Sequence, residues 1–304
     1  MPSPRDASPE LQSAMDEVTE AINRTIERLL PETDLAEAPL YDAMRHGVLS
    51  GGKRLRPFLA IHSAFLFNVD SSRARRVAAA IEFMHCYSLI HDDLPAMDDA
   101  SLRRGQPTVH KQYDEATAIL AGDALLTLAF EVLADPETHP DPHVQTELVR
   151  TLARASGGHG MVGGQMLDLI AEDDNVEFDA GEISRLQRMK TGQLMAFACE
   201  AGAILGKASE PQRRALRNYA HDLGLAFQVT DDILDVEADP QDTGKDTGKD
   251  EAAGKATFVS TLGKEAAKTR AEMLVGQAKR HLKIFEGRER ILCELADYVL
   301  ERRA

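Results

Sequence analysis

The sequence predicts an all-α fold in a single domain of 304 residues, and three observations support this prediction. Alanine, leucine and methionine dominate the apolar residues, tryptophan is absent, and aromatic residues make up only 5% of the chain. Such a composition favours helix over sheet. Apolar residues recur at spacings of three and four, whereas no stretch alternates with the period of two that marks a strand. No shift in composition marks a domain boundary.

The predicted helices follow one another between clusters of proline and glycine. The first carries apolar residues from Leu11 to Leu29 and is expected to end at Pro31. A helix that includes Val77 runs into Asp92, and one that includes Ala118 ends before the pair at 135–136. Further helices are expected at roughly 179–206, 211–236, 256–283 and 288–302.

Two segments are expected to lie outside this regular structure. Residues 1–10 are rich in proline and acidic side chains, and we expect them to be disordered. The segment 238–254 is long, polar and rich in Gly, Lys and Asp, which predicts a mobile lid loop.

The charge and cysteine content exclude several function classes. Lys and Arg number 35 against 50 Asp and Glu, so the net charge is −15 and the average field repels nucleic acid and anionic membranes. The three cysteines form no CxxC pair, which is typical of reduced thiols. No apolar run reaches 18 residues and no targeting signal is present, so we expect a cytoplasmic protein without an integral membrane segment.

Two aspartate clusters are the strongest functional signal: DDLPAMDD at 92–99 and DDILD at 231–235. The outer aspartates of the second cluster are four residues apart, so a helix places both on one face. In the first cluster, Pro95 should end the helix and let the chain turn Asp98 back towards Asp92. Crowded carboxylates need a cation, and Mg²⁺ suits them together with phosphate oxygens. Zinc fits worse because no cysteine pair or HExxH motif accompanies the acids.

Basic residues near the first cluster indicate a phosphate partner. Arg103 and Arg104 follow it, and an upstream GGKRLRP turn is expected to present three cations, Lys53, Arg54 and Arg56. Arginine suits bidentate phosphate binding. A nucleotide P-loop is disfavoured, because Arg54 stands where Ser or Thr should bind Mg²⁺.

Lys190 and two histidines complete the set of candidate groups. Lys190 lies inside an apolar helix, so we expect a ligand or a carboxylate beside it, the alternative being a lysine that reaches solvent. His85 and His91 flank the end of the helix that delivers Asp92. A phosphohydrolase with histidine ligands is disfavoured, because it would leave the doubled acid clusters unexplained.

Six motifs between residues 51 and 258 occur in the order of a known family: GGKRLRP, HCYSLIHDDLPAMDDASLRRGQPTVH, GMVGGQMLDL, KTG, FQVTDDILD and GKDEAAGKATF. The chain therefore resembles the trans-isoprenyl diphosphate synthases, specifically the bacterial short-chain farnesyl/geranylgeranyl type. The resemblance implies an antiparallel helical bundle around a deep central cavity, and a homodimer. It also implies head-to-tail condensation of dimethylallyl or geranyl diphosphate with isopentenyl diphosphate through an allylic carbocation, with Mg²⁺ as cofactor (about three ions per active site).

The resemblance also assigns roles to residues. The Mg²⁺ ligands would be Asp92, Asp98 and Asp231, with Asp93 and Asp235 as supporting carboxylates. The allylic diphosphate would be bound by Arg103, Lys190, Thr191, Gln228, Lys245 and Lys255, and Lys249 is an alternative to Lys245 as the lid lysine. The isopentenyl diphosphate would be bound by Lys53, Arg56, His85 and Arg104. The catalytic set would be Asp92, Asp98, Asp231, Lys190 and Arg103.

Product length is expected to depend on Tyr87 and on the adjacent Ser88. Tyr87 precedes Asp92 by five residues, a little over one helical turn. The resemblance implies that the prenyl tail grows along this helix away from the metal, so a ring here would act as a floor. An aromatic residue at this position implies a fifteen-carbon product, farnesyl diphosphate, with geranylgeranyl diphosphate as the alternative. A second interpretation is that Tyr87 is only a packed core residue.

Two other functions stay open at this point. A class I terpene cyclase also has an Asp-rich Mg²⁺ site, although its second metal motif normally has an Asn/Asp, Ser/Thr, Glu pattern. A non-catalytic subunit of a heteromeric synthase is the non-enzyme alternative, although both acid motifs are intact here.

Overall fold

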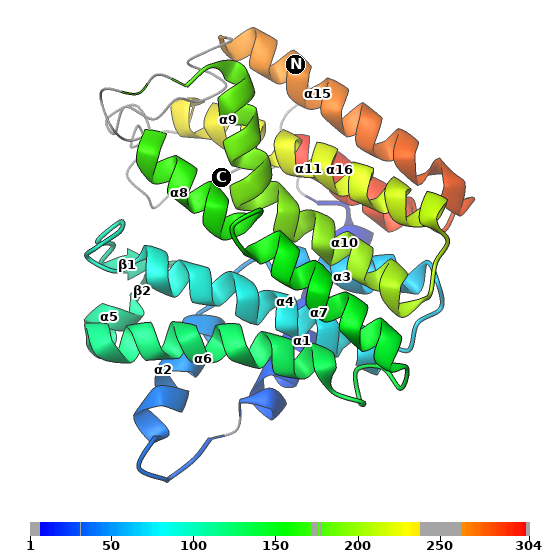
Figure 1. Cartoon of the computed structure of the whole chain (residues 1–304). Helices are drawn as coiled ribbons and strands as arrows, with labels where there is room; N and C mark the ends of the chain where they lie inside the picture. Colours follow the sequence, from blue (N-terminus) through cyan, green and yellow to red (C-terminus); the bar gives the residue numbers. More distant parts are fainter. Residues whose placement is uncertain (1–6, 31, 172–175, 177, 238–262, 302–304) are drawn as a thin grey trace. The chain divides into compact units, whose positions relative to one another are not determined.

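The computed structural model describes residues 7–30, 32–171, 176, 178–237 and 263–301. Within these residues the chain is almost entirely helical, which confirms the all-α prediction (Figure 1). The chain divides into two compact units. Unit 1 consists of Met1–Gln12, Arg150–Ala203 and Ala208–Ala304, and unit 2 of Ser13–Val149 and Ile204–Lys207. The single domain expected from the sequence stays a prediction.

Unit 2 holds the first half of the helices and a small hairpin. Its elements are α1 (Pro9–Leu29, which begins in unit 1), α2 (Ala38–Leu49), α3 (Leu55–Phe65), α4 (Ser71–Asp92), β1 (Leu102–Arg103), β2 (Gln106–Pro107), α5 (Val109–Gln112), α6 (Glu115–Ala134) and the start of α7 (Pro142–Ser156). The predicted first helix ends before Pro31, as expected.

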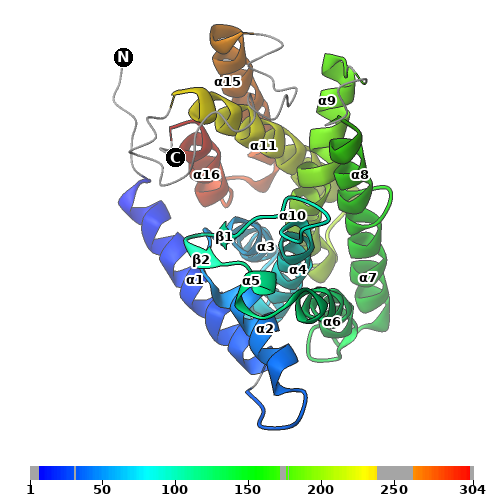
Figure 2. The ribbon, with the colours of Figure 1, turned by 90° about the vertical axis from the view of Figure 1, so that its left-hand side faces the viewer.

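The helix α4 is the core of unit 2 and packs against both α3 and α6 (Figure 2). Its middle, from Ala78 to Met84, is buried without interruption. The side chain of Asp70 begins the helix by accepting a hydrogen bond of 2.9 Å from the Ser72 N–H. The helix ends at Asp92, three residues before Pro95, as the sequence predicts.

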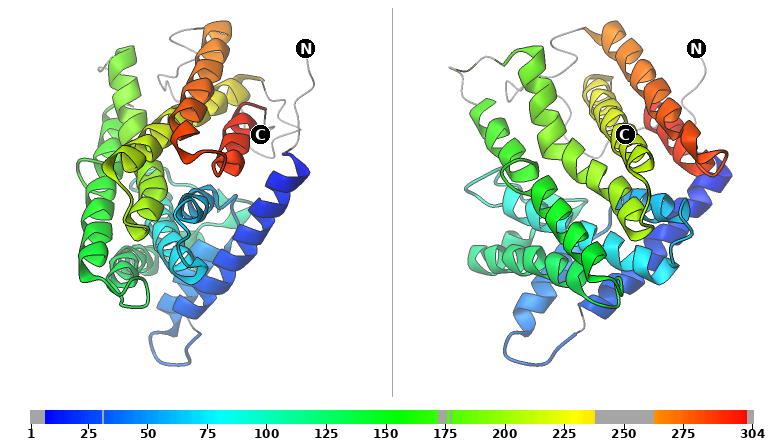
Figure 3. Two further views of the ribbon diagram at one scale, coloured as in Figure 1. Left: turned by 90° about the vertical axis from the view of Figure 1, so that its right-hand side faces the viewer. Right: turned by 45° about the vertical axis from the view of Figure 1, so that its right-hand side comes forward.

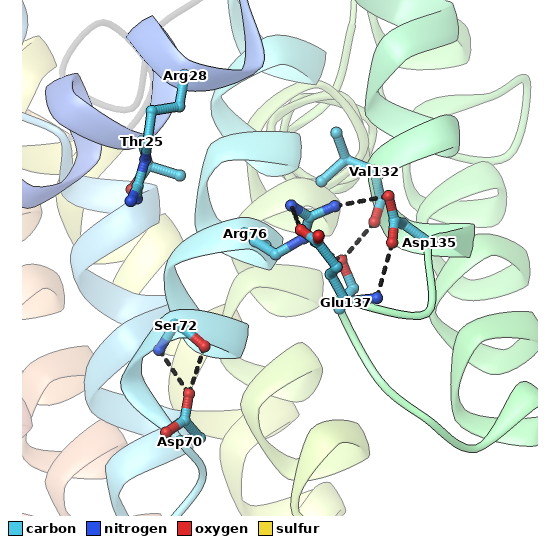
Figure 4. A network of polar contacts seen from close by, with 9 residues as sticks. Thr25, Arg28, Asp70, Ser72, Arg76, Val132, Asp135 and Glu137 are labelled. Carbon is cyan, nitrogen blue, oxygen red and sulfur yellow. Dashed lines mark hydrogen bonds and ion pairs between the residues drawn. The ribbon is translucent and has the colours of Figure 1, made fainter.

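A polar network ties the first turns of α4 to the end of α6 (Figure 4). The guanidinium of Arg76 lies 2.9 Å from Asp135 and 2.8 Å from Glu137, and its Nε donates to Thr138 at 3.0 Å. Thr138 in turn donates to the carbonyl of Val132, within the last turn of α6. These contacts provide partners for polar groups at the end of α6. The helix ends at Ala134, as the sequence predicts.

Among the described residues, α6 is the single helix that is long and apolar enough to cross a membrane by length and composition. Its sequence contains no uninterrupted apolar run of 18 residues, because Asp123 and Glu131 interrupt it. The side chains of Ala118, Ala121, Leu125 and Ala129 are fully buried, and the helix packs against α4. One face of α6 is thus buried, whereas Ile119 and Leu120 of the same helix are exposed.

Unit 1 holds the second half of the helices. Its elements are the end of α7, α8 (Met161–Ala171), α9 (Ala180–Gln187), the π-helical turn η1 (Arg188–Gly192), α10 (Gln193–Leu205, mostly), α11 (Glu210–Glu237), α15 (Lys264–His281), the 3-10 turn η2 (Leu282–Phe285) and α16 (Arg290–Glu301). The helices α11 and α15, yellow and orange in Figure 3, pack side by side. Tyr219 of α11 is fully buried and donates to the Leu292 carbonyl of α16 at 2.8 Å.

The structure corrects one predicted helix of unit 1. The sequence predicts a continuous helix over 179–206, which indeed begins with a capping box between Asp179 and Glu182. The turn η1 interrupts it, and the N–H of Gln193 bonds the carbonyl of Arg188, five residues earlier. One extra residue in the turn displaces the side chains that follow it by one position around the helix. Such π turns are frequent at functional sites.

Two predicted segments fall on residues that are not described. The expected lid at 238–254 lies wholly outside the described residues, as do the first six residues of the segment 1–10. The helix expected at 256–283 is described from Lys264 and ends at His281.

Candidate active site

The turn after α4 brings the acids of the first cluster together. The N–H of Asp98 donates to the carbonyl of Asp92 at 2.9 Å, and the N–H of Ala100 donates to that of Asp93 at 3.1 Å. Asp92 is half-buried and Asp98 is exposed. The chain thus folds back beyond Pro95, as predicted, and returns Asp98 to the end of the helix that carries Asp92.

Asp93 points away from solvent and holds Arg103. Its side chain is 4% exposed, and its two oxygens accept three hydrogen bonds of 2.6 to 2.9 Å from the guanidinium. Burial opposes the charge of Arg103, but the hydrogen bonds to Asp93 and the nearby Asp92 and Asp98 outweigh it and raise its pKa. Arg103 therefore stays charged beside the acids of the turn.

Arg103 and Arg104 lie on a hairpin that the sequence analysis did not predict. Strands β1 and β2 pair antiparallel, with Arg103 opposite Gln106. The two turn residues, Arg104 and Gly105, have φ of 53° and 76°. Positive φ at both positions is the signature of a tight two-residue hairpin turn. In the sequence, only the Arg-Gly pair indicates this turn. The strands of two residues are too short to show an alternating pattern that would predict a hairpin.

Arg104 connects this hairpin to the GGKRLRP turn by donating to the carbonyl of Gly51. Gly52 lies directly beneath its guanidinium, because a Cβ at position 52 would come within 2.5 Å of Nη1 of Arg104. Gly52 also has φ of 121°, a conformation that residues with side chains rarely adopt. The two motifs therefore form one structural unit.

The prediction that this turn presents three cations is wrong for Arg54. Arg54 is 3% exposed and pairs with Glu82 of α4 at 2.6 Å. It also donates to the Val48 carbonyl at 2.7 Å and to Asn23 at 3.0 Å. A charge this deep needs a buried partner, which sequence spacing could not reveal because Glu82 lies 28 residues away. The exposed Lys53 and the half-buried Arg56 remain as candidate ligands.

His85 lies among the arginines of these motifs. Burial lowers its pKa well below the usual value, and the charges of Arg56, Arg104 and Arg103 lower it further. Burial also lowers the pKa of Arg56, although the nearby Glu82 opposes the shift. His85 is therefore a neutral hydrogen-bonding group within a positively charged cluster, which suits a diphosphate.

Tyr87 is 6% exposed, and burial together with Asp92 raises its pKa to about 12. Its ring meets His91 edge-on at a centroid distance of 5.8 Å, and His91 bonds the carbonyl of Ile119 on α6 at 3.1 Å. Ser88 donates to the His85 carbonyl at 2.9 Å. Burial fits both interpretations of Tyr87, so its role in product length stays a prediction.

In unit 1, Lys190 pairs with the carboxylate of Asp168 on α8. Their side chains are 31% and 17% exposed, so the lysine has the carboxylate partner that its apolar surroundings predict. The π-helical turn that carries Lys190 and Thr191 packs closely against α8: a Cβ added at Gly164 would lie 2.2 Å from the backbone nitrogen of Lys190. Sequence reasoning assigned no role to Asp168 or Gly164, although both belong to the GMVGGQMLDL motif.

The second aspartate cluster lies near the end of α11, where Asp231 and Asp235 are four residues apart on one helix, as predicted. Asp231 is half-buried, whereas Asp232 is 4% exposed and accepts a hydrogen bond of 3.1 Å from Gln228. The side chain of Asp235 lies outside the described part, as do the candidate diphosphate ligands Lys245, Lys249 and Lys255.

The carboxylates of the first cluster are ligands of the kind that Mg²⁺ prefers. Within the described ranges, no group of three His, Cys, Asp or Glu side chains is arranged to hold a metal ion. Mg²⁺ keeps several waters and is bound by one or two carboxylates together with substrate phosphates. The turn from Asp92 to Asp98 offers carboxylates of this kind, so the residues present fit the ion.

Comparison with known proteins identifies the class to which this fold and these motifs belong. Residues 37–286 match the polyprenyl synthetase family model, and the chain belongs to this family. It is 44% identical over 289 residues to farnesyl diphosphate synthase of Escherichia coli strain K12, covering 92% of this chain and 95% of the relative. It is 40% identical to geranylgeranyl pyrophosphate synthase 9 of Arabidopsis thaliana, covering 92% of this chain and 78% of the relative.

Solved structures agree with this assignment. A crystal structure of an FPP/GFPP synthase from Zymomonas mobilis matches with a TM-score of 0.88 and 47% identity, covering 96% of this chain and 99% of that one. A geranyltransferase from Legionella pneumophila matches with a TM-score of 0.85 and 34% identity, covering 96% of each chain. The resemblance to isoprenyl diphosphate synthases is thereby confirmed.

Proposed function

We propose that the protein is a Mg²⁺-dependent trans-prenyltransferase that condenses dimethylallyl and then geranyl diphosphate with isopentenyl diphosphate to give farnesyl diphosphate. The arrangement of charged groups within unit 2 carries this proposal. The acids of the turn 92–98 lie beside the guanidinium of Arg103. Burial and the charges of Arg56 and Arg104 lower the pKa of His85, so this imidazole is neutral. Carboxylates, guanidinium groups and a neutral imidazole together suit the binding of a metal ion and diphosphates.

The reaction needs charge stabilisation rather than a nucleophilic side chain. The C–O bond of the allylic diphosphate breaks, and its electron pair leaves with the diphosphate. The alkene of isopentenyl diphosphate attacks the resulting carbocation, and loss of a proton restores the double bond. Mg²⁺ bound through Asp92, Asp98 and Asp231 would neutralise the leaving diphosphate.

Each group of residues has a proposed part in this reaction. Asp93 positions Arg103, and Asp235 supports the second acid cluster. Lys190, Thr191 and Gln228 bind the allylic diphosphate with Arg103, and Lys255 and either Lys245 or Lys249 complete that set. Isopentenyl diphosphate is bound by Lys53, Arg56, His85 and Arg104. The neutral imidazole of His85 can donate a hydrogen bond there without adding charge.

The product assignment rests on Tyr87, with Ser88 beside it. Four similar curated relatives carry the name farnesyl diphosphate synthase at 38% to 44% identity. Relatives named geranylgeranyl synthases reach 36% to 42% identity, so overall identity does not separate the two products. The ring of Tyr87, just over one turn from Asp92, favours the shorter product, and geranylgeranyl diphosphate is the alternative.

We further propose a cytoplasmic homodimer that binds isoprenyl diphosphates and no nucleic acid. The net charge of −15 supports the exclusion of nucleic acid. Sedimentation of the purified protein at about twice 33.3 kDa would support the dimer, and sedimentation at the single-chain mass would contradict it.

The test is condensation by the purified chain alone. Dimethylallyl and isopentenyl diphosphates with Mg²⁺ should yield a longer diphosphate ester, and EDTA should abolish the reaction. A cyclase would instead release hydrocarbon from a prenyl diphosphate without consuming isopentenyl diphosphate. A non-catalytic subunit would give no condensation product. Either of the last two results would overturn the proposal.

A further inference from the structure

Glu82 is a buried carboxylate on α4 that none of the roles above uses. It is 2% exposed, and its Oε1 lies 2.6 Å from Nη1 of Arg54. Cys86, one turn further along α4, donates its thiol to the same oxygen at 3.8 Å. Glu82 precedes His85 by three residues, so both side chains lie on neighbouring parts of one helix face.

Arg54, the partner of Glu82, stands between two proposed ligands in the GGKRLRP turn. Lys53 precedes it, and Arg56 follows two residues later. Arg54 is the residue before α3 and adopts a left-handed conformation with φ of 45°. Residues other than glycine hold this conformation only where surrounding contacts impose it.

Four contacts impose this conformation. Three come from the guanidinium, which bonds Glu82, the Val48 carbonyl and Asn23. The fourth is the carbonyl of Arg54, which accepts the N–H of Phe58 at 2.9 Å and so opens α3. Because Arg56 lies in the first turn of α3, the position of Arg54 sets where Arg56 stands.

The charge of Glu82 reaches Arg56 as well. Burial lowers the pKa of Arg56, and the charge of Glu82 is the largest effect that opposes this shift. One carboxylate thus anchors the residue between the two ligands and supports the charge of one of them. A buried ion pair is weak evidence for stability, since apolar residues of similar volume often replace such pairs without loss. The contacts of this pair, which lie between two proposed ligands, point instead to a positional role.

We propose that Glu82 is a positioning residue for the isopentenyl diphosphate site, acting through Arg54 to fix the turn that carries Lys53 and Arg56 against the helix that carries His85. This inference rests on the proposed function. It predicts a defect confined to one of the two substrates, because Arg103, a proposed ligand of the allylic diphosphate, is held by Asp93 and has no contact with Glu82 among those described.

The decisive variant replaces the pair together, as Arg54→Met with Glu82→Leu. Removing both charges leaves no unpaired buried ion, so the fold is expected to persist. Displacement of the turn by about 1 Å should raise KM for isopentenyl diphosphate at least about tenfold. KM for geranyl diphosphate should stay within about twofold, because its proposed ligands keep their contacts. Calorimetric titration with isopentenyl diphosphate should show the same loss of affinity without turnover.

A second variant, Glu82→Asp, keeps the buried charge pair but withdraws the carboxylate by one methylene. It should raise KM for isopentenyl diphosphate selectively, by a smaller factor than the double replacement. The matched control is Arg76→Met with Asp135→Asn, which removes another ion pair of the same helix. The control should leave both KM values at the wild-type level.

The outcomes separate this inference from the proposed function. Binding of isopentenyl diphosphate to the wild type tests the proposed function, and the ratio of variant to wild-type affinity tests the pair. Unchanged affinity in both Glu82 variants would overturn the positioning role. An equal rise in KM for both substrates would also overturn it, because that pattern indicates a general structural defect.

Discussion

Asp93 holds the guanidinium of Arg103 through three hydrogen bonds, from a position immediately after the helix that ends at Asp92. Adjacent aspartates in one motif thus face different partners. Asp93 turns inward to an arginine, whereas Asp92 stays half-buried beside the returning Asp98. A doubled acid motif of this kind provides a candidate metal ligand and an anchor for a cation that binds phosphate.

Replacing Asp93 with Asn should reduce kcat/KM for geranyl diphosphate by about 10- to 100-fold, since a charge-assisted hydrogen-bond set is worth about 1.5–3 kcal/mol. Steady-state kinetics with varied geranyl diphosphate provides the measurement. Asp114→Asn is the control, because Asp114 caps α6 and asparagine caps equally well. Equal activity of the two variants would contradict the role of Asp93.

Gly52→Ala should displace Arg104, because the new methyl would overlap its guanidinium. Gly51→Ala is a matched control, since Gly51 also has a positive φ but nothing lies within 4 Å of its would-be Cβ. The two variants share the backbone penalty, so their difference reports the overlap. KM for isopentenyl diphosphate should rise more in Gly52→Ala, and equal KM values would count against Arg104 as a ligand.

Gly164→Ala should destabilise unit 1 by about 1–3 kcal/mol, because its methyl would meet the backbone of the π-helical turn. The variant should also raise KM for geranyl diphosphate by shifting Lys190. Gly158→Ala, which has open space, should be close to neutral. Denaturant unfolding and steady-state kinetics of both variants provide the measurement. A wild-type KM for geranyl diphosphate in Gly164→Ala would show that the position of the turn does not affect substrate binding.

His62 should make the protein acid-sensitive. Its ring lies 4.1 Å from that of Phe58, and burial lowers its pKa to about 4. Below pH 6.5 the unfolded chain takes up a proton that native His62 does not, so stability falls as pH drops from 6.5 towards 4, by up to about 3 kcal/mol. His62→Gln should flatten this part of the curve of unfolding free energy against pH, whereas the exposed His159→Gln should not. An unchanged slope in His62→Gln would show that His62 does not titrate in this way.

Tyr87→Ala should lengthen the product, because it removes the ring just over one turn from Asp92. Chromatography of the dephosphorylated products should show twenty-carbon or longer chains in place of fifteen. Ser88→Ala, which removes only a hydroxyl group at the adjacent position, should lengthen the product less than Tyr87→Ala does. A fifteen-carbon product from Tyr87→Ala would assign the ring to core packing alone.

Local signals predicted the features of the site that depend on neighbouring residues. Pro95 predicted both the end of α4 and the return of Asp98, because proline cannot continue a helix. The spacing of Asp231 and Asp235 predicted their place on one helix. The ends of α1 at Leu29 and of α6 at Ala134 were predicted in the same way, from the prolines at positions 31 and 136.

Features that depend on tertiary packing escaped prediction. The sequence predicts that Arg54 is a third exposed cation of its turn. Its burial depends on the pairing with Glu82, 28 residues further along the chain, which no local pattern reveals. The π-helical turn adds one residue to a continuous helical pattern, and its backbone lies close to Gly164 on another helix, a contact that the local sequence does not reveal. The hairpin at Arg104 has strands of two residues, too short for any periodic signal.

The central claim is tested most directly by the product that the wild-type chain forms from labelled isopentenyl diphosphate and dimethylallyl diphosphate with Mg²⁺. We predict incorporation of two isopentenyl units to give farnesyl diphosphate, with release of inorganic diphosphate at each step. Absence of any condensed product from the folded, Mg²⁺-supplied protein would contradict the account.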